Sequence, residues 1–194
     1  MDLLFTKDSV RNSTITSSNQ PIYEISTPSR TFHTNTTTIK KLSTWGYGSG
    51  GVYDIAFIET HRFRDDICRV GGRDMAPKSD GLFSSAKSFN ASDGRRYSWK
   101  MKSNRATLYD KSKNIIASYE PSHTRFIFGR STPAKLSISQ AGMAIADDII
   151  ATFVLLEQKR REGGGDGGGG DGDGGGGGDG GGGSGDGGGG GGGC

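Results

Sequence analysis

The composition of the chain changes completely after Glu162, and this change separates a part that can fold from a part that cannot. Residues 163–194 are glycines, five aspartates, one serine and the final Cys194. Apart from that cysteine, this segment has no apolar side chain to offset the entropy of ordering its backbone. We therefore expect one folded domain of residues 1–162 and a disordered Gly/Asp-rich tail of residues 163–194.

The segment just before the change has no strand-like alternation, and its apolar residues cover nearly every direction of a helix. A helix that is apolar all round is buried in a core or lies in a membrane. The apolar run of residues 149–156 is far shorter than the ~20 residues of a membrane span, and Asp147 and Asp148 directly precede it. Acids at its start and Lys159 near its end suit the helix dipole. The sequence therefore predicts a buried helix over about residues 141–161.

The rest of residues 1–162 has the composition of a mainly β protein, because Thr, Ser, Tyr, Phe and Ile dominate and polar turns recur at short intervals. Alternation is clearest where Tyr97, Trp99 and Met101 share one face, and Asp93-Gly94 before them predicts a tight turn. The expected strands are residues 21–27, 31–42, 52–58, 66–70, 82–89, 96–101, 106–110, 115–120, 125–128 and 134–139.

The charge of the folded part favours anionic partners. The chain has 24 basic and 21 acidic residues, and five of the acidic ones lie in the tail, so residues 1–162 carry a net charge near +8. The candidate residues for an anionic-ligand surface are Lys40, Lys41, Arg95, Arg96, Lys100 and Lys102. The alternative is an ordinary solvated face. No nucleic-acid-reading motif is present, so we do not expect a nucleic-acid partner.

No catalytic or cofactor signature is found. The G-x-G-x-x-G match at residues 46–51 precedes a strand-like segment rather than a helix, which favours a hairpin loop. His33, His61 and His123 are not at metal-ligand spacing from one another or from a cysteine, so we expect no metal and no cofactor. One alternative is an enzyme with a site assembled near His123 and Cys68; the other is that Cys68 is a small core residue.

The two cysteines and the N-terminus suggest a compartment. Cys68 and Cys194 do not make a disulfide framework, and the first residues contain no apolar run of signal-peptide length. We expect an intracellular, cytoplasmic protein, with peripheral membrane association as an option. Cys194 lacks the context for prenylation. Two alternatives stay open for it: S-acylation, which anchors weakly without a second signal, and an inert exposed thiol.

Several short segments together resemble a known family. They are YEIST at residues 23–27, TTIKK at 37–41, DGRRYSWK at 93–100, IASY at 116–119, DDIIATF at 147–153 and EQKRR at 157–161. In this order they resemble a fungal family of uncharacterised domains, common in basidiomycetes, which is itself similar to the Tubby C-terminal, LURP-one-related and phospholipid-scramblase proteins. The resemblance covers roughly residues 1–162. It implies a closed antiparallel β-barrel of about twelve strands around a central, mostly apolar C-terminal helix.

The resemblance also carries functional expectations. Tubby proteins bind phosphoinositides through basic residues of the barrel surface, but their binding residues have no matched positions in this chain. Scramblase-like proteins use cysteine-rich palmitoylation and a calcium-binding segment, whereas this chain offers only Cys194 and no matching acidic loop. The main hypothesis is therefore a non-enzymatic intracellular module that binds anionic lipid headgroups or a protein partner. The alternatives are the enzyme near His123 and Cys68 and a scramblase-like membrane-associated protein.

Overall fold

A computed structural model describes residues 1–28, 34–42, 51–81, 86–124 and 131–163. Within them, short strands precede a single helical segment at the C-terminal side. The elements are β1 (Asp2–Phe5), β2 (Ser13–Ser17), β3 (Gln20–Ser26), β4 (Thr34–Leu42), β5 (Val52–His61), β6 (Ile67–Val70), β7 (Arg73–Asp74), β8 (Lys78–Ser79), β9 (Ala86–Asn90), β10 (Arg96–Lys102), β11 (Arg105–Tyr109), β12 (Ile115–Glu120), β13 (His123–Thr124), β14 (Ser131–Thr132), β15 (Lys135–Ile138), the 3₁₀ helix η1 (Gln140–Ile145) and α1 (Ala146–Gly163).

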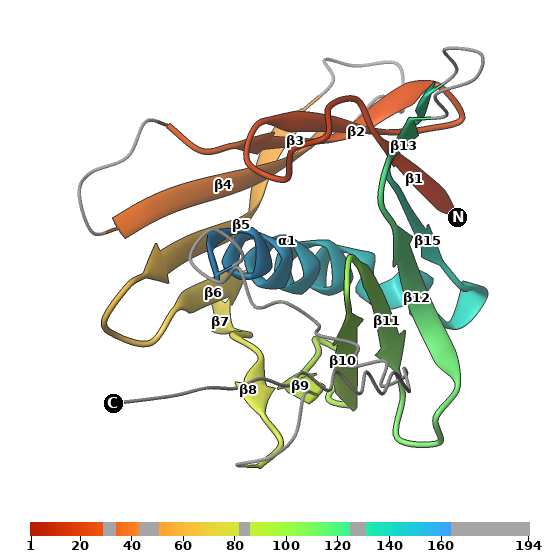
Figure 1. The fold of residues 1–194 in the computed structure, drawn as a ribbon. Helices are drawn as coiled ribbons and strands as arrows, with labels where there is room; N and C mark the ends of the chain where they lie inside the picture. The colour runs from red at the N-terminus through yellow and green to blue at the C-terminus, as the bar shows by residue number, and fades with distance from the viewer. Residues whose placement is uncertain (29–33, 43–50, 82–85, 125–130, 164–194) are drawn as a thin grey trace, which may run out of the picture.

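Thirteen of these strands form one antiparallel sheet, and β13 pairs only with β14 in a separate ribbon. The order across the large sheet is β7-β6-β5-β4-β3-β2-β1-β15-β12-β11-β10-β9-β8. Figure 1 shows the sheet curling around α1, with β3 and β4 above the helix and β8, β9 and β10 below it. The two edge strands, β7 and β8, follow each other in the chain and do not pair.

The expected closed β-barrel of about twelve strands is therefore wrong: the fold is mainly β, but its large sheet is open between β7 and β8. Each of these strands has only two residues, so neither offers a ladder long enough to close the sheet. The chain between them turns at Ala76, whose N–H binds Asp74 Oδ1 at 3.1 Å, and Pro77 has no N–H to donate. Closure was implied by the family resemblance and not by any residue pattern.

The predicted C-terminal helix is present, although residues 140–145 form a 3₁₀ turn before α1 begins at Ala146. The side chain of Phe153 is fully buried and meets the rings of Phe5, Trp99 and Tyr119 at centroid distances of 6.0, 5.9 and 4.5 Å. These three rings come from β1, β10 and β12, so the helix joins strands that are distant in the sheet. The core lies between the inner face of the sheet and α1.

The strand predictions are incomplete, and some of them fall on residues that the structure does not describe. β1 and β2 have no counterpart among the expected strands, although β1 lies between β2 and β15 in the middle of the sheet. The Asp93-Gly94 turn is confirmed, with Gly94 at φ +78°, where a side chain would be strained. The expected strand at 125–128 lies outside the described residues, as do residues 31–33 and 82–85 of two others, the 46–50 part of the loop and residues 164–194 of the tail.

Candidate functional site

The antiparallel order brings three separate chain segments together at the end of the sheet where α1 starts. β15 pairs with β1 on one side and with β12 on the other, so its last residues lie beside the first residues of both. The amino group of Met1 donates to Ile138 O at 2.7 Å, and Ser139 N donates to Ile116 O at 2.9 Å. Met1, the start of β12 and η1 therefore share one surface.

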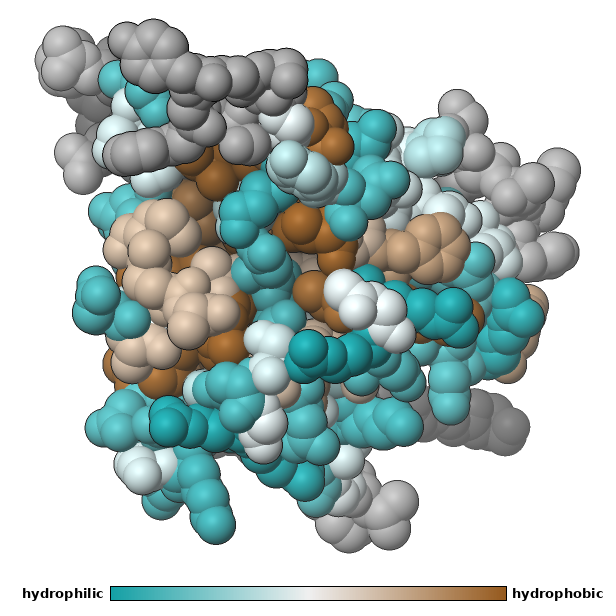
Figure 2. Space-filling view, turned by 180° about the vertical axis from the view of Figure 1, so that it is seen from behind, coloured by the Kyte–Doolittle hydropathy of each residue, from teal (hydrophilic) through white to brown (hydrophobic). Residues whose placement is uncertain are grey.

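This surface exposes large apolar side chains. Ile115 is 58% exposed, Met143 40% and Met1 37%. Ala141 and Ala144 of η1 are also exposed. Figure 2, seen from behind, shows a contiguous apolar area at its left, which is the side of η1 and the N-terminus in Figure 1. An exposed apolar cluster with a polar rim marks an interaction site more often than scattered apolar residues do.

Basic side chains flank the apolar cluster. Lys111 and Lys113 are exposed in the turn that precedes Ile115, and no described carboxylate lies within ion-pair distance of either one. The one acid of this turn, Asp110, accepts hydrogen bonds from Asn114 N and Nδ2, both at 2.8 Å. These bonds lower the pKa of Asp110, and the charge of Arg95 on the neighbouring turn contributes to the same shift.

We call Met1, Arg95, Lys111, Lys113, Ile115 and Met143 the helix-start surface. Arg95 is 81% exposed at its side chain and lies 4.0 Å from Asp93, a distance at which an exposed ion pair contributes little. The cations of this surface are thus available to an external anion.

The acids at the start of α1 have hydrogen-bond partners within the protein. Asp147 Oδ1 accepts from Tyr23 OH at 2.7 Å and from Lys41 Nζ at 3.0 Å. Burial, together with the charge and hydrogen bond of Asp147, raises the pKa of Tyr23. Asp148 is buried and accepts from Ser92 N at 2.7 Å. These bonds attach the first turn of α1 to β3, β4 and the turn before β10.

The six basic residues expected from the sequence do not form one patch. Arg95 belongs to the helix-start surface, whereas Arg96 pairs with Asp80 at 2.6 Å. Lys40 and Lys41 lie on β4. Lys100 Nζ lies 5.3 Å from the ring centroid of Tyr109. Lys102 is at the far end of β10.

Lys111, Lys113, Ile115 and the apolar residues of the N-terminus and η1 were not candidates from the sequence. The only sequence signal was local: a polar turn with two lysines directly before an apolar strand. The neighbourhood of Met1 and Met143 depends on pairings across more than a hundred residues, which no short pattern contains.

The structure does not bring His123 and Cys68 together. Cys68 is fully buried on β6. His123 is exposed on β13, and the two strands lie on opposite sides of the molecule in Figure 1. Burial, and then the charges of Asp74 and Asp148, raises the pKa of the Cys68 thiol to about 12, which suppresses the reactive thiolate. His33 and Cys194 lie outside the described residues.

With Cys194 replaced by serine, we expect Cys68 to react with a thiol reagent at pH 8 only when the chain is unfolded. The pKa of Cys68 is raised in the folded state, so its neutral form stabilises the fold below the ordinary thiol pKa of 9.0. That contribution is lost as the pH rises from 9.0 towards about 12. Labelling rates with and without denaturant test this, and equal rates would contradict the burial of Cys68.

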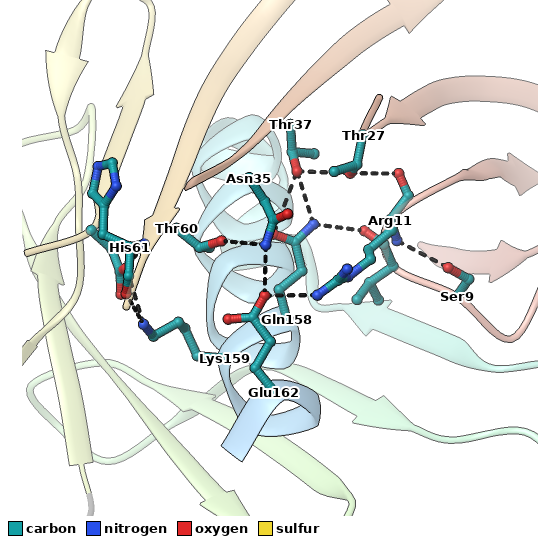
Figure 3. Close-up of polar contacts among 12 residues, drawn as sticks. Ser9, Arg11, Thr27, Asn35, Thr37, Thr60, His61, Gln158, Lys159 and Glu162 are labelled. Carbon is teal, nitrogen blue, oxygen red and sulfur yellow. Dashed lines mark hydrogen bonds and ion pairs between the residues drawn. The ribbon is translucent and has the colours of Figure 1, made fainter. Parts of the chain in front are cut away.

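The other end of α1 is also tied to the sheet, as Figure 3 shows. Gln158 Nε2 donates to Thr37 Oγ1 at 3.0 Å and to Val10 O at 3.2 Å. Glu162 Oε1 accepts from Arg11 at 2.7 Å and from Asn35 at 3.0 Å. These bonds hold the last turn of α1 against β4 and the segment before β2.

The basic residues of this last turn have partners inside the protein. Glu157, whose side chain is fully buried, accepts from Arg160 at 2.6 Å and from Arg161 at 2.8 Å. Lys159 Nζ donates to His61 O at 2.8 Å and to Asp66 at 3.2 Å. The cations near residue 160 therefore stabilise the end of the helix and are largely neutralised there.

Neither a metal site nor a membrane helix is found in the part of the chain that the structure describes. No group of three or more His, Cys, Asp or Glu side chains in the described ranges could hold a metal ion. None of the helices in those ranges has the length and apolar character that crossing a membrane requires.

Residues 8–162 match a protein family described as a family of unknown function, DUF6593. No curated protein and no solved structure matches the chain. These comparisons assign no ligand or reaction, and the resemblance to Tubby, LURP-one-related and scramblase proteins stays a prediction.

Proposed function

This chain belongs to the family of unknown function DUF6593, and we propose that it is a binding module that docks on an anionic lipid surface through the helix-start surface. The observation that supports this most is the combination, at one end of the fold, of exposed Met1, Ile115 and Met143 with two lysines, Lys111 and Lys113, that have no ion-pair partner among the described residues. An anionic bilayer offers such a surface both a negatively charged headgroup layer and the apolar acyl chains beneath it.

The free energy expected from this surface is suited to reversible membrane binding. A basic side chain near an anionic bilayer contributes about 1 kcal/mol. Full burial of an aliphatic side chain contributes roughly 1.5–3 kcal/mol, and Met1, Ile115 and Met143 are exposed only in part. Three cations and three partly inserted side chains can therefore exceed the cost of association without making attachment permanent.

We expect the full chain to float with vesicles of phosphatidylcholine and phosphatidylserine, but not with phosphatidylcholine alone. The double substitution Lys111→Gln/Lys113→Gln removes two contributions of about 1 kcal/mol each and should weaken vesicle binding by about thirtyfold. Met143→Ser should weaken binding without changing its salt dependence, because it removes apolar contact only.

The matched control is Lys7→Gln/Lys102→Gln, which removes the same charge from the opposite end of the strands. Phe63→Ser, at an 84% exposed apolar position after β5, is the control for Met143→Ser. If both charge variants lose binding equally, the protein senses only net charge and the helix-start surface is not the site. If no vesicle binding occurs even at low salt, the lipid proposal is wrong and a protein partner remains as the alternative.

A further inference from the structure

The open seam between the two sheet edges contains a pocket of about 490 Å³. β7, β8 and their connection form its rim, and the second half of α1 contributes Leu155, Leu156 and Lys159. The remaining lining residues are Arg64, Asp65, Asp66, Asp74, Ala76, Pro77, Lys78, Ser79 and Lys87. This volume lies in the range of sites for small organic molecules, and it is too small for a macromolecule to enter.

The pocket contains a lysine where the strand pattern calls for a core residue. Lys87 is opposite Trp99 in the β9–β10 register, and Trp99 is fully buried, so Lys87 belongs to the inner face of the sheet. Its Nζ donates to Ser79 Oγ at 2.7 Å. Within the described ranges, no carboxylate forms an ion pair with Lys87. This hydrogen bond is exposed to solvent, so an anion that enters the pocket can reach the ammonium group of Lys87 without displacing a protein carboxylate.

The acids of the pocket are only partly available to compensate this lysine. Asp66 Oδ1 already accepts from His61 N at 2.8 Å and from Lys159 Nζ at 3.2 Å. Asp74 Oδ1 accepts from Ala76 N. Arg64 and Lys78, like Lys87, form no ion pair within the described ranges. Asp65, the third acid of the lining, and Asp74 form no ion pair within the described ranges, so three basic residues without an ion pair stand against two such acids and the unengaged charge of the pocket is net positive.

We propose that the seam pocket binds a small organic anion, a carboxylate or a phosphate that carries a short apolar group. Lys87 and Ser79 hold the anionic group, with Lys78 and Arg64 at the rim. The apolar group lies over Leu156, Ala76 and Pro77, which with Leu155 form the apolar part of the lining. This site uses none of the residues of the helix-start surface, so it does not depend on the membrane proposal.

The chemistry of Lys87 agrees with this ligand class. A lysine binds carboxylate and phosphate oxygens through charge-assisted hydrogen bonds, which are about twice as strong as neutral ones. The serine hydroxyl beside it can donate to the same anion, because a hydroxyl both donates and accepts. Because Lys87, Lys78 and Arg64 of the lining form no ion pair within the described ranges, the pocket favours an anion over a cation.

The test is calorimetric titration of the full chain with octanoate, octyl phosphate, inorganic phosphate and octylammonium. We expect octanoate or octyl phosphate to bind, with the better of the two identifying the headgroup, and octylammonium not to bind. Inorganic phosphate should bind at least tenfold more weakly than octyl phosphate, because it lacks the apolar group. Equal affinities for these two would overturn the amphiphilic ligand class.

Three variants test whether the anion binds in the seam pocket. Lys87→Met keeps the aliphatic volume and should weaken anion binding at least tenfold, the loss expected for one charge-assisted hydrogen bond. Ala76→Phe fills the pocket and should weaken binding without changing its charge. Lys102→Met, on the neighbouring strand outside the pocket, is the matched control and should bind as the unmodified chain does. The proposal is overturned if neither amphiphile binds, or if both pocket variants bind them with unchanged affinity while remaining folded by circular dichroism.

Discussion

A chain that ends at Asp148 is expected to lose cooperative thermal unfolding altogether. The deletion removes the buried side chains of α1, including Ile149, Ile150 and Phe153, which are fully buried. Burial of each such side chain stabilises a fold by roughly 1.5–3 kcal/mol, and with Val154 and Leu155 the sum reaches the 5–15 kcal/mol of a whole domain. The inner face of the sheet would then be open to water.

The measurement is a melting curve followed by circular dichroism, with a chain that ends at Gly163 as its control. That chain keeps every described contact of α1, including those of Gln158 and Glu162. We therefore expect it to melt cooperatively, close to the temperature of the full chain. A cooperative transition of the chain ending at Asp148 would show that the sheet folds without its helix, contrary to the packing described above.

The substitution Phe153→Ala is expected to lower the free energy of unfolding by about 3–5 kcal/mol. Phe153 is the ring at which Phe5, Trp99 and Tyr119 meet, at centroid distances of 4.5 to 6.0 Å. Strands β1, β10 and β12 cannot close over the vacated space without losing their pairing, so a cavity remains. Urea denaturation measures the loss.

Two substitutions calibrate this result. Phe153→Leu keeps most of the volume and should cost less than half as much as the alanine variant. Ile115→Ala, at a 58% exposed position of β12, should change stability by at most about 0.5 kcal/mol. If Phe153→Ala costs no more than Ile115→Ala, Phe153 does not organise the core.

The parts of the fold that could be predicted were those that depend on residues close to one another in the sequence. Tyr97, Trp99 and Met101 alternate because successive side chains of a strand point to opposite faces. Gly94 marks a turn because its backbone has φ +78°. The helix is visible in the apolar run after Asp148, whose residues need burial in all directions. β1 was missed because its four residues, Asp2–Phe5, include three apolar residues in a row and are too few to show alternation.

The candidate sites were less predictable. Arg95 was a candidate from its charge alone, but Lys102, chosen in the same way, lies at the opposite end of β10. Lys87 looked like an ordinary strand lysine, and only its register opposite Trp99 places it on the inner face. Charge can be counted along a chain, whereas the direction of a side chain depends on the pairing of its strand.

The residue pattern alone thus defined a mainly β protein with one buried C-terminal helix, because alternation and all-round apolarity are local consequences of how strands and helices bury side chains. The tertiary structure decided that the sheet stays open between β7 and β8, that a pocket occupies this seam, and that Met1, Ile115 and Met143 lie at the same end of the sheet. These features arise from pairings between distant strands and from two short edges that fail to pair. Their free energies depend on the packing of the whole chain around α1 and not on any single segment.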